Sequence, residues 1–158
     1  MSRPTRLCGF DYIGPYRYFL TICVRDRRDA FADAQVVAAT LAQFRRIASR
    51  CQFAILAYCF MPDHVHVLVE GTSNESDVRA FVKRAKQASG QSYARCARGP
   101  LWQEGYYERV LRASEDAKQV ARYIVANPIR AQLVATSFEY PHVESDVWTL
   151  AELVGSVM

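Results

Sequence analysis

Hydrophobic side chains recur along the chain with two spacings, and the changes between them mark seven elements. Stretches rich in aromatic and β-branched residues, or alternating between polar and apolar residues, predict strands. Stretches with an apolar residue at every third or fourth position predict helices. The strands are expected at residues 16–24, 53–60, 64–70 and 106–111. The helices are expected at residues 35–50, 77–94 and 114–126, with Ser114 as the N-cap of the last one.

The order of these elements is β-α-β-β-α-β-α. Its first six members predict an α+β, ferredoxin-like fold, in which two helices cover one face of a four-stranded antiparallel sheet. The last helix is additional and could cover part of the other face. No linker or low-complexity tract divides the chain. We therefore expect a single domain over residues 1–158, with a core at about 16–134 and an acidic C-terminal tail at 135–158.

Two of the three histidines lie two positions apart on the predicted strand HVHVLVE. Residues two apart on a strand share a face, so His64 and His66 point one way and the intervening valines point the other. The valines suit the face beneath the helices, which places both imidazoles on the open face. Two neutral imidazoles at this spacing can bind one divalent ion. By itself, however, a His-x-His pair is more often two surface histidines on a half-buried strand.

The last predicted helix carries Tyr123 and Asn127 four positions apart, hence on one helical face. An amide oxygen of Asn127 could complete a His-His-Asn ligand set for magnesium or manganese. Tyr123 would then lie beside the metal, where a phenol can attack a polarised phosphate. From spacing alone, a core aromatic and an ordinary residue at the end of a helix remain the simpler interpretation.

Charge and cysteine content narrow the class of protein. The net charge is +4, and only three of the 20 basic residues are lysines. Residues 76–112 have a balance of +5 and residues from 135 onward a balance of −4, which suggests a polyanionic partner for one surface. The five cysteines form no C-x-x-C pair, and no apolar run approaches the roughly 20 residues of a membrane span. We expect a cytoplasmic protein with reduced thiols and no contact with a membrane.

Four segments resemble a known family. MPDHVHVLVE resembles the HUH motif (histidine, hydrophobic, histidine) of the single-tyrosine transposases. WQEGYY, which begins at Trp102, and the later ARYIVANPIRAQLV resemble the REP-associated tyrosine transposase branch, and YFLTICVRDRRDAF fits as well. The similarity extends from about Tyr16 to Val134, with the motifs in the family's order.

The resemblance implies an HUH endonuclease fold that acts on single-stranded DNA with a divalent metal ion, Mg²⁺ or Mn²⁺. The metal ligands map onto His64, His66 and Asn127, and the nucleophile maps onto Tyr123. Many relatives have glutamine at the third ligand position, so Asn127 is the least secure of these transfers. The implied reaction is a transesterification through a 5′-phosphotyrosine, which cleaves and later rejoins the DNA strand. A hairpin or palindromic DNA element is the implied partner, and whether the protein acts as a monomer or a homodimer stays open.

The substrate would require cations and aromatic rings outside the reacting centre. Basic side chains of the second predicted helix could contact phosphates, and aromatic side chains near the fourth strand could stack on unpaired bases. For the aromatic residues, ordinary packing is an equally good interpretation. The candidates for DNA binding are Arg79, Lys83, Lys86, Trp102, Tyr106 and Tyr107.

Three other functions compete with this interpretation. A non-catalytic nucleic-acid-binding module could use the open face of the same sheet, and would bind equally well without metal. A replication initiator or relaxase of the HUH type is disfavoured by the short chain and the single late tyrosine. A structural zinc protein would more often use cysteine ligands, and no cysteine flanks the two histidines.

Overall fold

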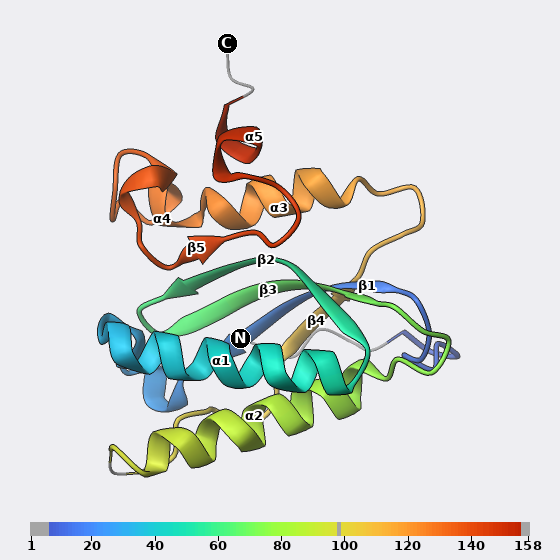
Figure 1. The fold of residues 1–158 in the computed structure, drawn as a ribbon, viewed down its shortest axis with the longest axis horizontal. Coiled ribbons are helices and arrows are strands. Elements are labelled where there is room, and N and C mark those ends of the chain that lie inside the picture. The colour runs from blue at the N-terminus through green and yellow to red at the C-terminus, as the bar shows by residue number, and fades with distance from the viewer. Residues whose placement is uncertain (1–6, 98, 156–158) are drawn as a thin grey trace.

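Five antiparallel strands form one sheet in the order β4-β1-β3-β2-β5 (Figure 1). The computed structural model describes residues 7–97 and 99–155. The strands are β1 (Arg17–Cys23), β2 (Phe53–Met61), β3 (His64–Gly71), β4 (Tyr107–Val110) and β5 (Val143–Glu144). The helices are α1 (Ala34–Arg50), α2 (Val78–Ala94), α3 (Ala117–Val125), α4 (Asn127–Arg130) and α5 (Leu150–Val154). The α+β, ferredoxin-like prediction is confirmed, with β5 as an unforeseen fifth strand.

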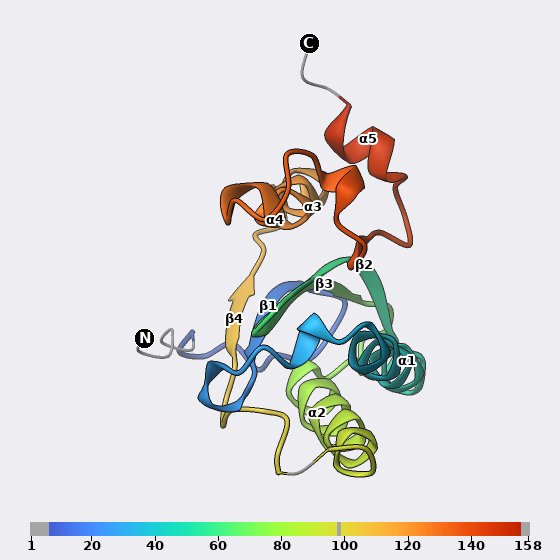
Figure 2. The same cartoon turned by 90° about the vertical axis from the view of Figure 1, so that its left-hand side faces the viewer.

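The sheet separates two hydrophobic cores. Figure 2 shows α1 and α2 below the sheet and α3, α4 and α5 above it. The lower core contains Val65, Val67 and Val69 of β3, together with the apolar faces of α1 and α2. The upper core contains Leu68 of β3 and the buried residues of α3. The alternation along β3 therefore divides its side chains between the two faces as predicted, and the additional helix covers part of the second face.

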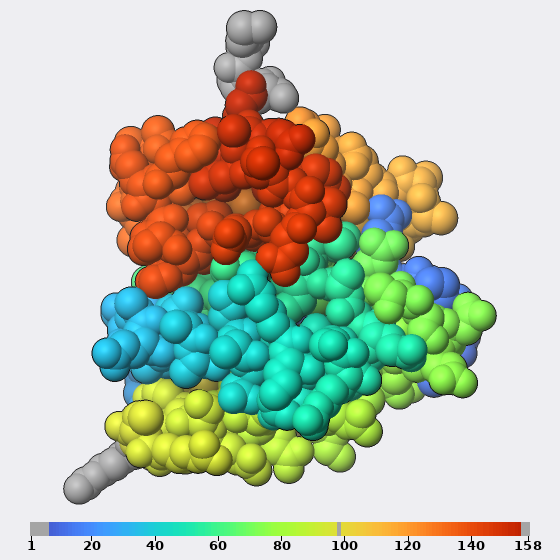
Figure 3. Space-filling view, in the orientation of Figure 1, coloured from blue at the N-terminus to red at the C-terminus, as the bar shows by residue number. Residues whose placement is uncertain are grey.

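Residues 135–155 belong to the folded structure. β5 pairs with β2, and α5 packs against α3. Ser137 Oγ donates a hydrogen bond to the carbonyl of Val125 over 2.6 Å, and the Tyr140 hydroxyl donates to the carbonyl of Phe60. In the space-filling view of Figure 3, this segment (red) lies over α3 (orange). It thus binds the additional helix to the sheet.

α3 begins two residues later than expected. Asp116, not Ser114, is the N-cap, and its carboxylate accepts a hydrogen bond from the backbone N–H of Lys118 over 2.9 Å. Residues 112–115 form a turn instead, because Glu115 accepts from both the backbone of Arg112 and the side chain of Arg109. Within the described residues, no helix has the length and apolar character needed to cross a bilayer.

Trp102 joins the loop before β4 to the lower core. Its indole is 8 % exposed, stacks on Phe44 at 5.9 Å between ring centroids, and donates a 2.9 Å hydrogen bond to Ser89 Oγ. Because truncation would leave a large cavity, Trp102→Ala is expected to lower the free energy of unfolding by about 3–5 kcal/mol in urea titrations. The control Phe138→Ala, at a side chain 59 % exposed, should stay within about 0.5 kcal/mol of the parent. A Trp102→Ala loss no larger than the control's would show that the indole does not stabilise the core.

Candidate functional site

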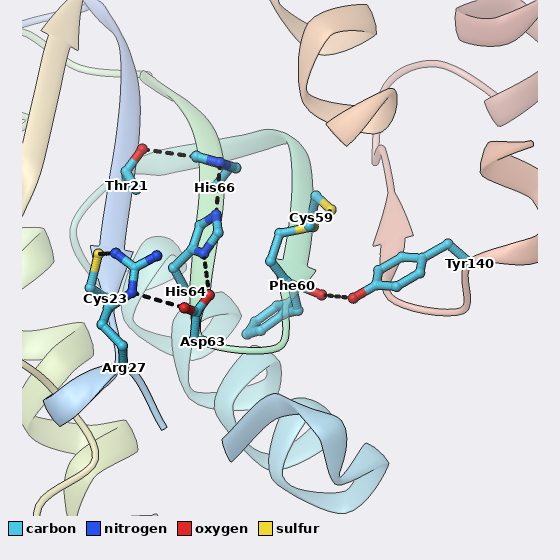
Figure 4. A network of polar contacts seen from close by, with 10 residues as sticks. Thr21, Cys23, Arg27, Cys59, Phe60, Asp63, His64, His66 and Tyr140 are labelled. Carbon is cyan, nitrogen blue, oxygen red and sulfur yellow. Dashed lines mark hydrogen bonds and ion pairs between the residues drawn. The ribbon is translucent and has the colours of Figure 1, made fainter. Parts of the chain in front are cut away.

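The two imidazoles of β3 face one another on the α3 side of the sheet. His64 Nε2 and His66 Nε2 are 3.1 Å apart, and the rings are nearly perpendicular, at 81° (Figure 4). In the sheet, His64 is paired with Cys23 of β1 and Met61 of β2, so its backbone is held on both sides. Both histidines point away from α1 and α2, as predicted. Both Nε2 atoms are therefore directed at a common point.

The opposite ring nitrogens are held by side chains of neighbouring elements. His64 Nδ1 lies 2.7 Å from Asp63 Oδ1, and His66 Nδ1 lies 2.8 Å from Thr21 Oγ1. A carboxylate only accepts, so His64 donates through Nδ1–H, and its Nε2 is unprotonated when the ring is neutral. These contacts fix how each ring is turned and which nitrogen is directed at the centre.

Arg27 extends this network. Its Nε donates to Asp63 Oδ2 over 2.9 Å, and one terminal nitrogen lies 3.2 Å from Cys23 Sγ (Figure 4). Asp26 and Arg27 both have left-handed backbones, with φ of 56° and 52°, a conformation that is costly for residues other than glycine and recurs at functional sites. Burial alone would raise the pKa of the Asp63 carboxyl, but hydrogen bonds from His64 and Arg27 bring it below its usual value. Asp63 is therefore a carboxylate at neutral pH.

His66 is electrically neutral in this environment. Burial, more than any other cause, lowers its pKa to about 3, and the neighbouring His64, Arg130 and Arg27 act in the same direction. A neutral imidazole keeps a lone pair for a metal ion or a hydrogen bond. The pair is thus suited to bind a cation that replaces the contact between the two Nε2 atoms.

Tyr123 of α3 is on the same side of the sheet as the histidines. Its side chain is exposed, at 56 %, although the helix around it is largely buried. The ring of Phe19 lies between the rings of His66 and Tyr123, with its centroid 5.4 Å from that of His66 and 6.2 Å from that of Tyr123. Tyr123 is therefore a solvent-accessible phenol near the histidine pair, not a core aromatic.

Asn127 is the first residue of α4, directly after α3. Its side-chain amide nitrogen is buried, and among the described residues it has no hydrogen-bond partner. A buried amide without a partner is costly, and such a group calls for an explanation. The described residues contain no cluster of three or more His, Cys, Asp or Glu side chains able to hold a metal ion. A third protein ligand would therefore be of another type, such as the amide oxygen of Asn127, since the amide nitrogen is a donor and binds no cation.

A cleft of about 1170 Å³ opens between β4 and α3, and Tyr123 lines it. Its other walls include Phe19, Thr21 and Tyr107, so the cleft adjoins the residues that contact His66. Arg109 also lines it and is paired with Glu115 at 2.8 Å. An apolar, aromatic wall with a few polar groups suits flat unpaired bases.

The predicted phosphate contacts of α2 are not at this site. Arg79, Lys83 and Lys86 belong to the helix layer on the opposite side of the sheet (Figure 2). The Arg79 guanidinium donates to the carbonyl of Asp11 over 2.9 Å, and Lys86 Nζ donates to the carbonyls of Gln103 and Gly105 over 2.8 Å. Any contact of these cations with DNA would be away from the histidine pair.

The three aromatic candidates have different surroundings. Trp102 is in the lower core, so its predicted availability for stacking on bases is wrong for this structure. Tyr106 packs partly buried against the same core. Tyr107 lines the cleft, opposite Thr21 in the β1–β4 pairing. Only Tyr107 combines the predicted residue type with a position beside the histidine pair.

Sequence reasoning missed five residues of this site, Phe19, Thr21, Arg27, Asp63 and Arg130. Thr21 and Phe19 follow the strand alternation of β1, so a known β1–β3 register would have revealed them. Arg27 depends on an unusual backbone turn, for which the sequence carries no clear signal. Arg130 follows Pro128, and its return towards Tyr123 depends on the short helix α4.

Comparison with known proteins shows the family of the chain. The family model described as "Transposase IS200 like" matches residues 14–127, which include both histidines, Tyr123 and Asn127. A REP-associated tyrosine transposase of Escherichia coli is 25% identical over 130 residues, which cover 82% of this chain and 76% of that protein. A solved structure of a REP-associated tyrosine transposase bound to a REP hairpin is similar in fold, with a TM-score of 0.74. It is 22% identical, and the match covers 90% of this chain and 82% of that one. On the matched sequence and the shared fold, the chain belongs to the IS200-like transposase family.

Proposed function

We propose that this transposase cleaves and rejoins single-stranded DNA in a metal-dependent transesterification through a 5′-phosphotyrosine. The observation that carries the proposal is the pair of Nε2 atoms 3.1 Å apart, each ring anchored through Nδ1, on the face where Tyr123 is exposed. Family membership supports a reaction on DNA.

The residues present fit a divalent cation. The two Nε2 atoms are 3.1 Å apart, so one divalent ion could contact both, and imidazole nitrogens are ligands that such ions accept. His66 would donate Nδ1–H to Thr21, as His64 does to Asp63, which leaves both Nε2 lone pairs for the ion. Asn127 is the proposed third ligand, through its side-chain amide oxygen, which is the kind of ligand that Mg²⁺ and Mn²⁺ take. Mg²⁺ or Mn²⁺, when bound, would polarise the scissile phosphate.

Tyr123 is the proposed nucleophile. Its phenolic oxygen forms a bond to phosphorus while the bond from phosphorus to the 3′ oxygen breaks. The phenolic proton is lost and the departing 3′ oxygen gains one, which leaves a 5′-phosphotyrosine and a free 3′-hydroxyl. Attack by a 3′-hydroxyl on the phosphotyrosine reverses these changes and reseals the strand. The exchange of one phosphodiester for another needs no ATP.

The cleft beside Tyr123 is the proposed path of the unpaired strand. Tyr107 and Phe19 offer ring faces to bases, and the cleft leads to the exposed phenol. A hairpin with a single-stranded flank is the proposed substrate, because a related transposase of the same fold was solved with a REP hairpin. Arg79 and Lys83 would then contact only parts of the DNA remote from the reacting phosphate.

The test is incubation of the protein with labelled hairpin DNA that carries a single-stranded flank, with Mn²⁺ or Mg²⁺, followed by denaturing electrophoresis. A labelled band that migrates with the protein and disappears in EDTA is expected. Binding without any covalent adduct, equally strong in EDTA, would instead support a non-catalytic nucleic-acid-binding module.

Asp63→Asn is expected to weaken Mn²⁺ binding by about 10- to 100-fold, because a residue that orients a metal-bound histidine contributes to that degree. An amide can donate to, as well as accept from, Nδ1 and thus no longer fixes the ring tautomer. Isothermal titration calorimetry with Mn²⁺ measures the affinity. Asp33→Asn, at the N-cap of α1 on the other layer, is the matched control, and equal affinities in the two variants would contradict the role of Asp63.

A further inference from the structure

Arg130 makes two contacts with Tyr123, the proposed nucleophile. The central carbon of its guanidinium lies 3.7 Å from the centroid of the Tyr123 ring, and a terminal nitrogen donates to the Tyr123 carbonyl over 2.7 Å. A flat guanidinium over a phenol ring is a favourable cation–π arrangement, which lysine reproduces poorly. Together the two contacts restrain both the ring and the backbone of Tyr123.

The local backbone explains how a residue seven positions later reaches back to this ring. α3 ends at Val125, and Pro128 lies in the first turn of the four-residue helix α4. The backbone N–H of Arg130 donates to the carbonyl of Ala126 over 3.1 Å, which closes that turn. The turn directs the side chain of Arg130 back along α3, over the exposed phenol.

The guanidinium is also close to the histidine pair. The Tyr123 ring on which it lies is 6.2 Å from the ring of Phe19, and Phe19 is 5.4 Å from His66, centroid to centroid. Arg130 itself is exposed. One exposed cation therefore lies on the ring of the proposed nucleophile, on the side of the sheet that carries the histidine pair.

We propose that Arg130 is the positioning residue of Tyr123 and that its charge stabilises the reacting phosphate. This inference rests on the proposed function. As the bond from Tyr123 to phosphorus forms, negative charge builds up on the phosphate oxygens, and a fixed cation is most effective there. The same guanidinium keeps the phenol directed at the phosphate, so less freedom is lost on reaching the transition state.

The experiment measures single-turnover adduct formation at saturating hairpin DNA and Mn²⁺, together with the Kd for DNA in EDTA. Arg130→Ala is expected to slow adduct formation by about 100-fold, the usual effect of removing one fixed group that stabilises developing charge, with Kd changed less than threefold. Arg46→Ala, on exposed α1 surface of the other layer, is the matched arginine control and should react at the parent rate.

Two further variants separate charge from shape and keep the test valid if Arg130→Ala folds poorly. Arg130→Lys retains the positive charge but lacks the planar guanidinium. Its rate of adduct formation is expected to be about tenfold higher than that of Arg130→Gln, which is neutral and of similar length. Lysine and glutamine variants of equal rate would overturn the electrostatic role. A rate within threefold of the parent for Arg130→Ala, or a loss explained entirely by a higher Kd, would overturn the inference as a whole. Failure of the parent protein to form any adduct would instead refute the proposed function itself.

Discussion

Tyr123→Phe is expected to abolish the covalent protein–DNA adduct while leaving the fold and DNA binding intact. Phenylalanine keeps the ring that packs against Phe19 and lies beneath Arg130, and loses only the oxygen that would bond to phosphorus. Because no other group can take over that bond, we expect a loss of at least about 10⁴-fold, as for other removed nucleophiles. Denaturing electrophoresis of labelled hairpin DNA with Mn²⁺ measures the adduct.

Tyr16→Phe is the matched control for this substitution. Tyr16 is also exposed, at 40 %, and its ring contacts Phe10 instead of the histidine pair. The control should form the adduct at the parent rate. If the adduct persists in Tyr123→Phe and is lost in another tyrosine variant, the assignment of the nucleophile is wrong, although a phosphotyrosine mechanism would survive.

His66→Ala is expected to reduce adduct formation by on the order of 10³-fold and to remove tight Mn²⁺ binding. The substitution deletes one of the two facing Nε2 atoms and the ring that Thr21 orients. A single imidazole with an amide is a poor site for a divalent ion, and loss of a fixed catalytic group has effects of this size. Calorimetry with Mn²⁺ and the adduct assay give the two readouts.

The third histidine provides the control. His142 lies in the C-terminal segment beside β5, and its ring contacts Tyr140 away from the β3 pair. His142→Ala should bind Mn²⁺ and react like the parent. Undiminished cleavage by His66→Ala would rule out the proposed metal site, since neither remaining histidine could replace the missing ligand.

The fold was predictable because each main element carries its own periodic signal. The alternation in HVHVLVE was enough to assign the valines and the histidines to opposite faces of the sheet, and the structure confirms it. The start of α3 was not predicted correctly, since Ser114 and Asp116 are both good N-caps and only the contacts of Glu115 favour the second.

The surroundings of the site were less predictable, because they depend on register and on which layer an element joins. Thr21 reaches His66 across a strand pairing 45 residues apart in sequence, which no local pattern encodes. The cations of α2 illustrate the opposite case. In a β-α-β-β-α-β fold both helices cover one face, so histidines on the other face already exclude Lys83 from the reacting centre. For Trp102, the residue type alone could not distinguish the two roles, because an aromatic side chain is expected both in a core and at a site that stacks on bases.

The segment that binds α3 to the sheet has a consequence for biosynthesis. Both histidines and Tyr123 leave the ribosome before residues 137–154, whose contacts with Val125, Phe60 and β2 fasten the helix in place. The contacts of Tyr140 with Phe60 and of β5 with β2 join residues far apart in sequence, and such long-range pairings are slow to form. A partly synthesised chain would therefore hold both histidines and Tyr123 before α3 is fastened to the sheet.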